Sequence, residues 1–170
     1  MGNVVKIECV NCATTVEVEM GTSLVELAEK LALKGKYPLL AAYVNHKLKE
    51  LNYRIYTPAK VEFFDISHLA GFRVYQRSII FIMQAVVSTL YPGQKFHARH
   101  AIGDSLYCEV EGKHDFSIEE CKALYESAKS IVAQNIPITR EKLPTEEVIA
   151  EFAKRGYDDK VDILQSRKHL

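Results

Sequence analysis

The segment from Tyr75 to Leu90 constrains the fold more than any other part of this chain. Its isoleucines, valines, methionine and leucine recur at helical spacing around much of the circumference, and the run stops at Tyr91-Pro92-Gly93. A helix that is apolar on most of its sides is buried in a folded protein. We therefore expect a long helix with a sheet wrapped around it.

The residues before this helix predict a small β-rich segment. Apolar and acidic residues alternate from Thr14 to Met20, which is typical of a strand. Ser23 and Glu26 have the spacing of a capping box, and Gly35 is a natural end for the helix that follows. Further strands are expected, with a turn at Asn45-His46, over Val4–Cys9, Leu39–Val44, Lys47–Leu51 and Val61–Asp65.

The residues after the long helix predict a second mixed segment. A strand pair is expected around the turn Gly103-Asp104, and Ser117 with Glu120 forms a second capping box that opens a helix. A helix is also expected from Pro144 to Arg155. The remaining expected elements are strands over Lys95–Ile102, Ser105–Glu111, Ile136–Leu143 and Val161–Leu164.

Charge and hydropathy limit the partners of the chain. Lys and Arg total 22 and Asp and Glu total 22, so no overall basic surplus attracts nucleic acid, although a local patch can hide in that average. The longest apolar run, 79–83, is too short to cross a bilayer. No secretory signal opens the chain, and we expect a cytoplasmic protein without a membrane partner.

Four cysteines leave two interpretations open. Cys9 and Cys12 form a lone Cys-x-x-Cys, whereas Cys108 and Cys121 are too far apart in sequence to form a second zinc knuckle. The four thiols converge on a structural zinc only if the fold brings them together. The alternative, which we favour, is reduced thiols, two flanking a hairpin turn and two half-buried, with no metal.

The first segment resembles a TGS domain. Its element order is that of a ubiquitin-like β-grasp, and Val44–Leu51 reads Val-Asn-x-x-Leu-x-Glu-Leu. The resemblance covers roughly residues 3–66. TGS domains open threonyl-tRNA synthetase and also occur in stringent-response synthetases and some GTPases.

The second segment resembles the editing-type domain of threonyl-tRNA synthetase. The motifs that carry this resemblance occur in order and with similar spacing: Leu90-Tyr91-Pro92, Gly103 before Leu106–Val110, Ile118-Glu119-Glu120, Phe152-Ala153-Lys154-Arg155-Gly156, and Lys160 to Leu164. Together the two resemblances imply an α+β protein. They place a β-grasp domain at 1–67 and an editing-like domain, a central helix wrapped by an antiparallel sheet, at 72–170.

This chain departs from the family at the hydrolytic pocket. The family carries His-x-x-x-His on the first helix, and those positions hold Arg77 and Phe81 here. A Cys-x-x-x-His would follow Leu164, where His169 is the sole candidate and has no cysteine partner. The resemblance therefore implies a domain without catalytic residues, and one that belongs to a longer polypeptide.

The same combination of domains resembles the N-terminal region of bacterial uridine (nucleoside) kinase fusion proteins. These 170 residues contain no Gly-x-x-x-x-Gly-Lys-Ser/Thr, so ATP and magnesium are expected only for a downstream kinase domain. The leading hypothesis is a noncatalytic module that binds RNA, a small anionic ligand or its own kinase domain. The alternatives are an aminoacyl-tRNA editing hydrolase and a structural adaptor.

Five residues form the predicted ligand site. One interpretation is that Arg77, His97, Arg99 and His100 line the old pocket, near Asp104, and grip a phosphate or carboxylate. The other is that the histidines alternate along a solvent-facing strand. We expect Arg77 to lie on a buried helix and thus to need a partner, either an acidic side chain such as Asp104 or a bound anion.

Overall fold

The chain folds into two compact units, Met1–Phe81 and Ile82–Leu170. The computed structural model describes residues 3–113 and 115–167. Helices and sheets are both present, which is compatible with the predicted α+β class. The domain limits 1–67 and 72–170 stay a prediction. His169, discussed above, lies outside the described part.

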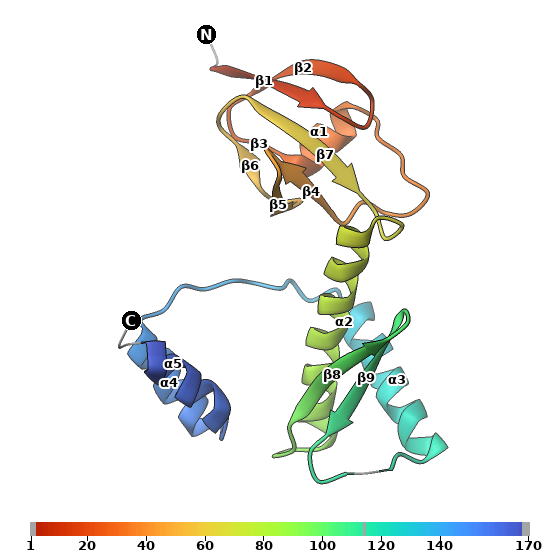
Figure 1. The fold of residues 1–170 in the computed structure, drawn as a ribbon, viewed down its shortest axis with the longest axis vertical. Helices are drawn as coiled ribbons and strands as arrows, with labels where there is room; N and C mark the ends of the chain where they lie inside the picture. Colours follow the sequence, from red (N-terminus) through yellow and green to blue (C-terminus); the bar gives the residue numbers. More distant parts are fainter. Residues whose placement is uncertain (1–2, 114, 168–170) are drawn as a thin grey trace. The chain divides into compact units, whose positions relative to one another are not determined.

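A five-stranded sheet with one short helix makes up most of the first unit (Figure 1). The strand order is β2-β1-β7-β4-β5, and only the β1–β7 pairing is parallel among these neighbours. A two-stranded pair, β3 with β6, completes the unit. The bounds are β1 Val4–Cys9, β2 Thr14–Glu19, β3 Thr22–Ser23, α1 Leu24–Lys30, β4 Ala41–Val44, β5 Lys47–Glu50, β6 Arg54–Ile55 and β7 Ala59–Phe64.

Period-two alternation builds the core of this unit. Val5, Ile7 and Cys9 of β1 are buried while their neighbours are exposed, because successive side chains of a strand point to opposite faces. Leu24 and Leu27 of α1 are fully buried in the same apolar cluster. The helix therefore covers the face of the sheet that the alternation makes apolar.

The capping box of α1 is confirmed, but the predicted end of the helix is wrong. Glu26 N–H donates to Ser23 Oγ at 3.2 Å, and Ser23 N–H donates to Glu26 Oε2 at 2.6 Å. The helix ends at Lys30 rather than Gly35, because Ala32 takes a left-handed φ of 48° and Leu33 N–H donates back to Ala28. Gly35 serves a different need, since a Cβ there would lie 2.8 Å from Asp65 Oδ2.

Helix α2, Leu69–Leu90, begins six residues earlier than predicted and is far less buried. Only Val86 and Val87 of its large apolar side chains are buried, and Phe81 is 60% exposed. The second unit contains only a small sheet among its described residues, made of two strands, β8 Phe96–Ile102 and β9 Ser105–Val110. Two strands cannot surround a helix, so the expected wrapped arrangement is absent from the described residues.

The C-terminal part of the chain corrects two strand predictions. Residues 136–143 form no strand, and Pro137 removes a donor that a sheet would need. Residues 161–164 are helical rather than extended. Helix α3, Ile118–Ala133, has its predicted capping box, and two helices pack together after it, α4 Thr145–Lys154 and α5 Asp158–Arg167 (Figure 1).

No helix in the described ranges is long and apolar enough to cross a membrane.

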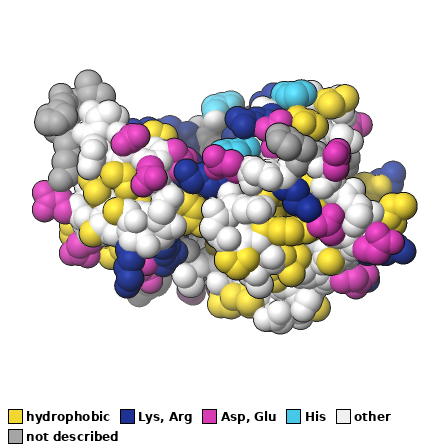
Figure 2. Space-filling model, turned by 90° about the horizontal axis from the view of Figure 1, so that it is seen from below, with side chains coloured by type: hydrophobic (Ala, Val, Ile, Leu, Met, Phe, Trp, Pro, Cys, Tyr) yellow, Lys and Arg dark blue, Asp and Glu magenta, His cyan; other side chains and the backbone are white. Residues whose placement is uncertain are grey.

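On the face that Figure 2 shows, acidic and basic side chains are interspersed. Such mixing agrees with equal numbers of acidic and basic residues in the sequence.

Candidate functional site

Three side chains form a cationic and aromatic stripe on α2. Arg73, Arg77 and Phe81 are spaced four residues apart, so they follow one face of the helix, and all three are exposed. Residues 69–90 contain no Asp or Glu. We call these three residues the α2 stripe. Because Arg77 is exposed, the expectation that burial forces a partner on it is wrong.

The α2 stripe is free of ion pairs within the described ranges, since neither arginine forms a salt bridge there. A guanidinium stays protonated and offers several donors to a phosphate. An exposed ring four residues away can stack on a base. The stripe therefore has the chemistry of a nucleic-acid contact rather than that of a hydrolytic pair.

The β8–β9 hairpin gathers three of the predicted site residues on one face. The residue pairs Phe96 with Val110 and Ala98 with Cys108 form the apolar face. The opposite face, which we call the hairpin polar face, contains His97, Arg99, His100, Tyr107 and Glu109.

A bulge keeps this hairpin amphipathic. The register shifts between Ala98 and His100, which leaves Arg99 without a partner residue in the ladder. Arg99 and His100 can thus both serve the polar side: Arg99 Nε donates to Glu109 Oε2 at 2.6 Å, and the His100 ring lies 5.0 Å from the Tyr107 ring. Sequence reading found the cations but missed the bulge and both partners.

Electrostatics on the hairpin polar face are largely satisfied internally. The hydrogen bond from Arg99 holds the pKa of Glu109 below its usual value, and the hydrogen bond to Glu109 raises the pKa of Tyr107. His97 Nε2 lies 4.0 Å from Glu111 Oε2. A pocket of about 290 Å³ lies on this face, and its lining includes His97, Arg99, Glu109 and Glu111. The basic side chains of this pocket therefore already contact carboxylates of the protein itself.

Asp104 and Arg77 stand apart from that face in the chain. Asp104 is exposed in the turn between β8 and β9, and it does not line the hairpin pocket. Arg77 belongs to the first unit and Asp104 to the second. Their grouping into one site stays a prediction.

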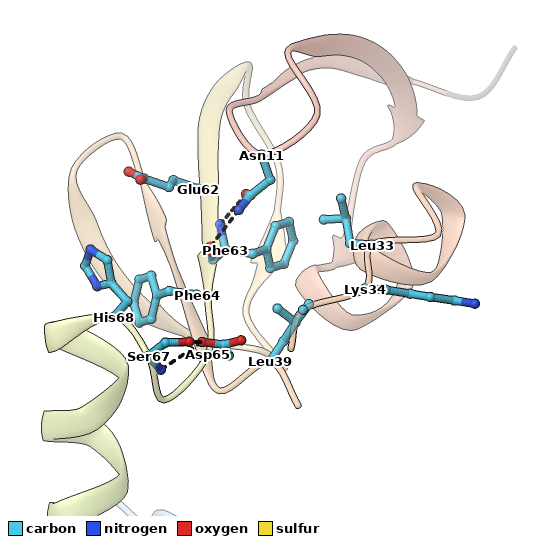
Figure 3. Close-up of a pocket in the computed structure, with 11 residues that line it drawn as sticks. Asn11, Leu33, Lys34, Leu39, Glu62, Phe63, Phe64, Asp65, Ser67 and His68 are labelled. Carbon is cyan, nitrogen blue, oxygen red and sulfur yellow. Dashed lines mark hydrogen bonds between the residues drawn. The ribbon is translucent and has the colours of Figure 1, made fainter. Parts of the chain in front are cut away.

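A larger pocket of about 500 Å³ lies in the first unit, and sequence reading missed it (Figure 3). Asn11 forms one wall through two hydrogen bonds to the backbone of Phe63, at 2.7 and 2.8 Å. The His68 ring stacks on Phe64 with centroids 5.1 Å apart. Lys34 lies along the loop after α1. We call this cavity the Asn11 pocket.

Asp65 lines the Asn11 pocket and connects neighbouring segments through hydrogen bonds. Its carboxylate accepts hydrogen bonds from Tyr37 N–H at 3.2 Å, from Ser67 N–H at 2.8 Å and from the Ser67 hydroxyl. The Ser67 hydroxyl is the largest cause of a lowered pKa for Asp65. A Cβ on Gly71 would meet the Asp65 carbonyl oxygen at 1.9 Å, so α2 begins closely against this residue.

Within the described part of the chain, no three His, Cys, Asp or Glu residues converge as metal ligands would. All four cysteines are free thiols; Cys9 is buried, and Cys12, Cys108 and Cys121 are exposed. The prediction that Cys108 and Cys121 are half-buried is therefore wrong.

Comparison with known proteins finds threonine–tRNA ligases among the relatives of this chain. The chain is 29% identical over 149 residues to a threonine–tRNA ligase of Syntrophomonas wolfei, covering 88% of this chain and 24% of the relative. It is 28% identical over 150 residues to that of Clostridium kluyveri (88% and 24%) and 28% identical over 151 residues to that of Chlorobium phaeobacteroides (87% and 23%). No family model matches the chain.

These relatives support the predicted relation to the N-terminal region of threonyl-tRNA synthetase. They lend no support to the uridine kinase relation. The chain spans about a quarter of the length of the curated relatives it matches. A function related to tRNA, either binding or editing, thus fits the relatives better than a function attached to a kinase.

Proposed function

We propose that this chain is a tRNA-recognition module related to threonyl-tRNA synthetase, and that it binds tRNA without hydrolysing an aminoacyl ester. One observation carries the proposal. The similarity extends over 149 residues, more than either unit contains, while Arg77 and Phe81 stand where the resemblance implies the paired histidines of the family.

The side chains at these two positions argue against hydrolysis. Ester cleavage needs a general base or an activated water. Arginine has no lone pair to accept a proton, and phenylalanine has no polar atom at all. The proposed activity is therefore binding.

The α2 stripe supports tRNA as the ligand. Arg73 and Arg77, which form no salt bridge with any described residue, can contact successive phosphates. Phe81, 60% exposed, can stack on an unpaired base. The hairpin polar face supports a small anionic ligand less well, because Glu109 and Glu111 place carboxylates beside His97 and Arg99.

The strand order supports assigning the TGS-like β-grasp fold to the first unit. The element order resembles that of a ubiquitin-like β-grasp, and the helix packs on a five-stranded mixed sheet in which β1 lies beside β7. The second unit is assigned as editing-like on its motifs and relatives. We also propose a cytoplasmic location, as for proteins that act on tRNA.

A titration with uncharged tRNA tests the proposal. The full chain is expected to bind, with an affinity that falls as salt increases, because released counterions drive phosphate contacts. Phe81→Ala should weaken binding about 5- to 150-fold, the range of one lost stacking contact. Arg77→Gln should reduce the salt slope by about 0.7–0.9, which corresponds to one phosphate.

Arg140→Gln and Tyr125→Ala are the matched controls. Arg140 is exposed in the segment between α3 and α4, and Tyr125 is 61% exposed on α3. Neither belongs to the α2 stripe, so both variants should bind as the parent chain does. Equal weakening by all four substitutions, or no binding by the parent chain, would contradict the proposal.

An editing hydrolase is the second candidate, because the relatives are threonine–tRNA ligases. Turnover of a seryl ester on a threonine tRNA separates it from the binding module. The kinase-fusion prediction has no support among the relatives and stays a prediction of the sequence alone.

A further inference from the structure

Cys9 and Cys12 lie at the two sides of one tight loop. Cys9 is the last residue of β1 and is fully buried, whereas Cys12 is exposed in the loop that leads to β2. Ala13 N–H donates to the Val10 carbonyl at 3.2 Å, and Ala13 has a left-handed φ of 49°. The chain therefore reverses between the two thiols.

The two thiols lie in different surroundings. Burial raises the pKa of Cys9 most, and a side-chain hydrogen bond with Cys12 raises it further. Cys9 is enclosed in the interior, while Cys12 is exposed to solvent. An exposed thiol beside a buried one provides an attacking group and a resolving group within one loop.

Asn11 lies between these cysteines and holds the loop to β7. Its amide donates to the Phe63 carbonyl at 2.8 Å and its oxygen accepts from Phe63 N–H at 2.7 Å (Figure 3). The same oxygen lies 4.0 Å from Cys9 Sγ. Asn11 therefore touches the sulfur on one side and forms the wall of the Asn11 pocket on the other.

We propose that Cys9 and Cys12 form a reversible disulfide by exchange with a low-molecular-weight disulfide such as oxidised glutathione, and that this modification detaches Asn11 from Phe63. The inference does not depend on tRNA binding. It assigns a modification site to the loop between β1 and β2.

The exchange is balanced in two steps. The Cys12 thiolate attacks one sulfur of the oxidised glutathione, forms a mixed disulfide and releases one glutathione thiolate. The Cys9 thiolate then attacks the Cys12 sulfur and releases the second glutathione thiolate. The protons of the two protein thiols end on the two glutathione thiols. Two electrons pass from the protein to glutathione.

The proposed disulfide affects Asn11 because Cys12 Sγ and the Asn11 oxygen would compete for the position beside Cys9 Sγ. A disulfide needs the two sulfurs about 2.05 Å apart, so Cys12 Sγ must move against the buried Cys9 Sγ. The Asn11 oxygen occupies a position beside that sulfur. Its displacement breaks the paired hydrogen bonds to Phe63 and opens the wall of the Asn11 pocket.

Full-length chain carrying Cys108→Ser and Cys121→Ser is the background for the test, because both thiols are exposed and would react independently. The protein is equilibrated with mixtures of reduced and oxidised glutathione and mapped by mass spectrometry of non-reduced peptides. The expected product joins Cys9 to Cys12 and disappears with excess reduced glutathione. Hydrogen exchange at the Phe63 amide should be faster in that product.

Cys12→Ser is the matched control, because it preserves the buried Cys9 and hence the fold. This variant should gain no glutathione and should keep the slow exchange of Phe63. A stable glutathione adduct on Cys12 in the background protein, without the joined peptide, would overturn the disulfide. A joined peptide with unchanged Phe63 exchange would overturn its coupling to Asn11.

Discussion

The first unit buries a continuous apolar core, whereas the second leaves many large apolar side chains exposed. Ile7, Leu27 and Val61 have no exposed surface in the first unit. In the second, Ile118 and Ile138 are each 71% exposed. Both units alternate apolar and polar residues along their strands, but five strands and a helix enclose a core that two strands cannot.

This contrast separates the parts of the chain that carry stability from those that offer surface. The α2 stripe belongs to the well-packed first unit. The start of its helix is packed closely, because Gly71 lies against the backbone of Asp65. The hairpin polar face depends on a ribbon with little core of its own. A binding surface on the first unit should therefore survive changes that disturb the second.

Leu27→Ala is expected to have the largest effect on this comparison. The side chain is fully buried, so its truncation should lower the free energy of unfolding of the first unit by about 2–5 kcal/mol. Denaturant unfolding, monitored by hydrogen exchange at individual amides, shows which unit loses stability. The control Ile118→Ala, at a highly exposed side chain, should stay within about 0.5 kcal/mol. Similar losses for both would break the contrast.

The two capping boxes allow a matched comparison of smaller size. Ser23 and Ser117 make the same pair of hydrogen bonds, but Ser23 is buried and Ser117 is exposed. Ser23→Ala should cost about 1–2 kcal/mol of unfolding free energy, and Ser117→Ala about 0.5–1 kcal/mol, since water can replace the exposed bond. Thermal unfolding of each variant measures the difference. The reverse order would refute the assignment of packing to the first unit.

Acid should weaken the first unit through Asp65, with the smallest effect. Hydrogen bonds from Ser67 and Tyr37 lower the pKa of this carboxyl in the folded chain. Its contribution is therefore present above the unfolded pKa, about 3.9, and is lost as pH falls through the lower folded value. Unfolding measured between about pH 2 and pH 6 should show a shallower pH dependence in Asp65→Asn. An identical dependence in both proteins would show that the carboxylate contributes nothing.

Local signals in the sequence predicted much of the first unit and the start of α3 in the second. The strand alternation and both capping boxes depend on neighbours within a few residues, and the structure confirms them. Strands β3 and β6 were missed because each contains two residues and exists only through the other. The final helix was misread as a strand because Val161 and Ile163 fit the strand period, while Val161 and Leu164 fit the helical period, in so short a run.

The candidate site was predicted only in part. His97, Arg99 and His100 were found as a basic cluster, but Glu109 pairs with Arg99 across a bulge that the alternation hides. Asp65 was missed because its partner Tyr37 lies 28 residues away. Arg77 was expected to be buried because its helix is largely apolar, but its side chain is exposed.

A single assay on a seryl ester of threonine tRNA tests the central claim most directly. The chain is mixed with this tRNA, and complex formation and ester survival are followed in the same samples. We predict a complex, together with an ester lifetime equal to that of free seryl-tRNA. Ester loss that depends on the chain, or the absence of any complex, would contradict the account.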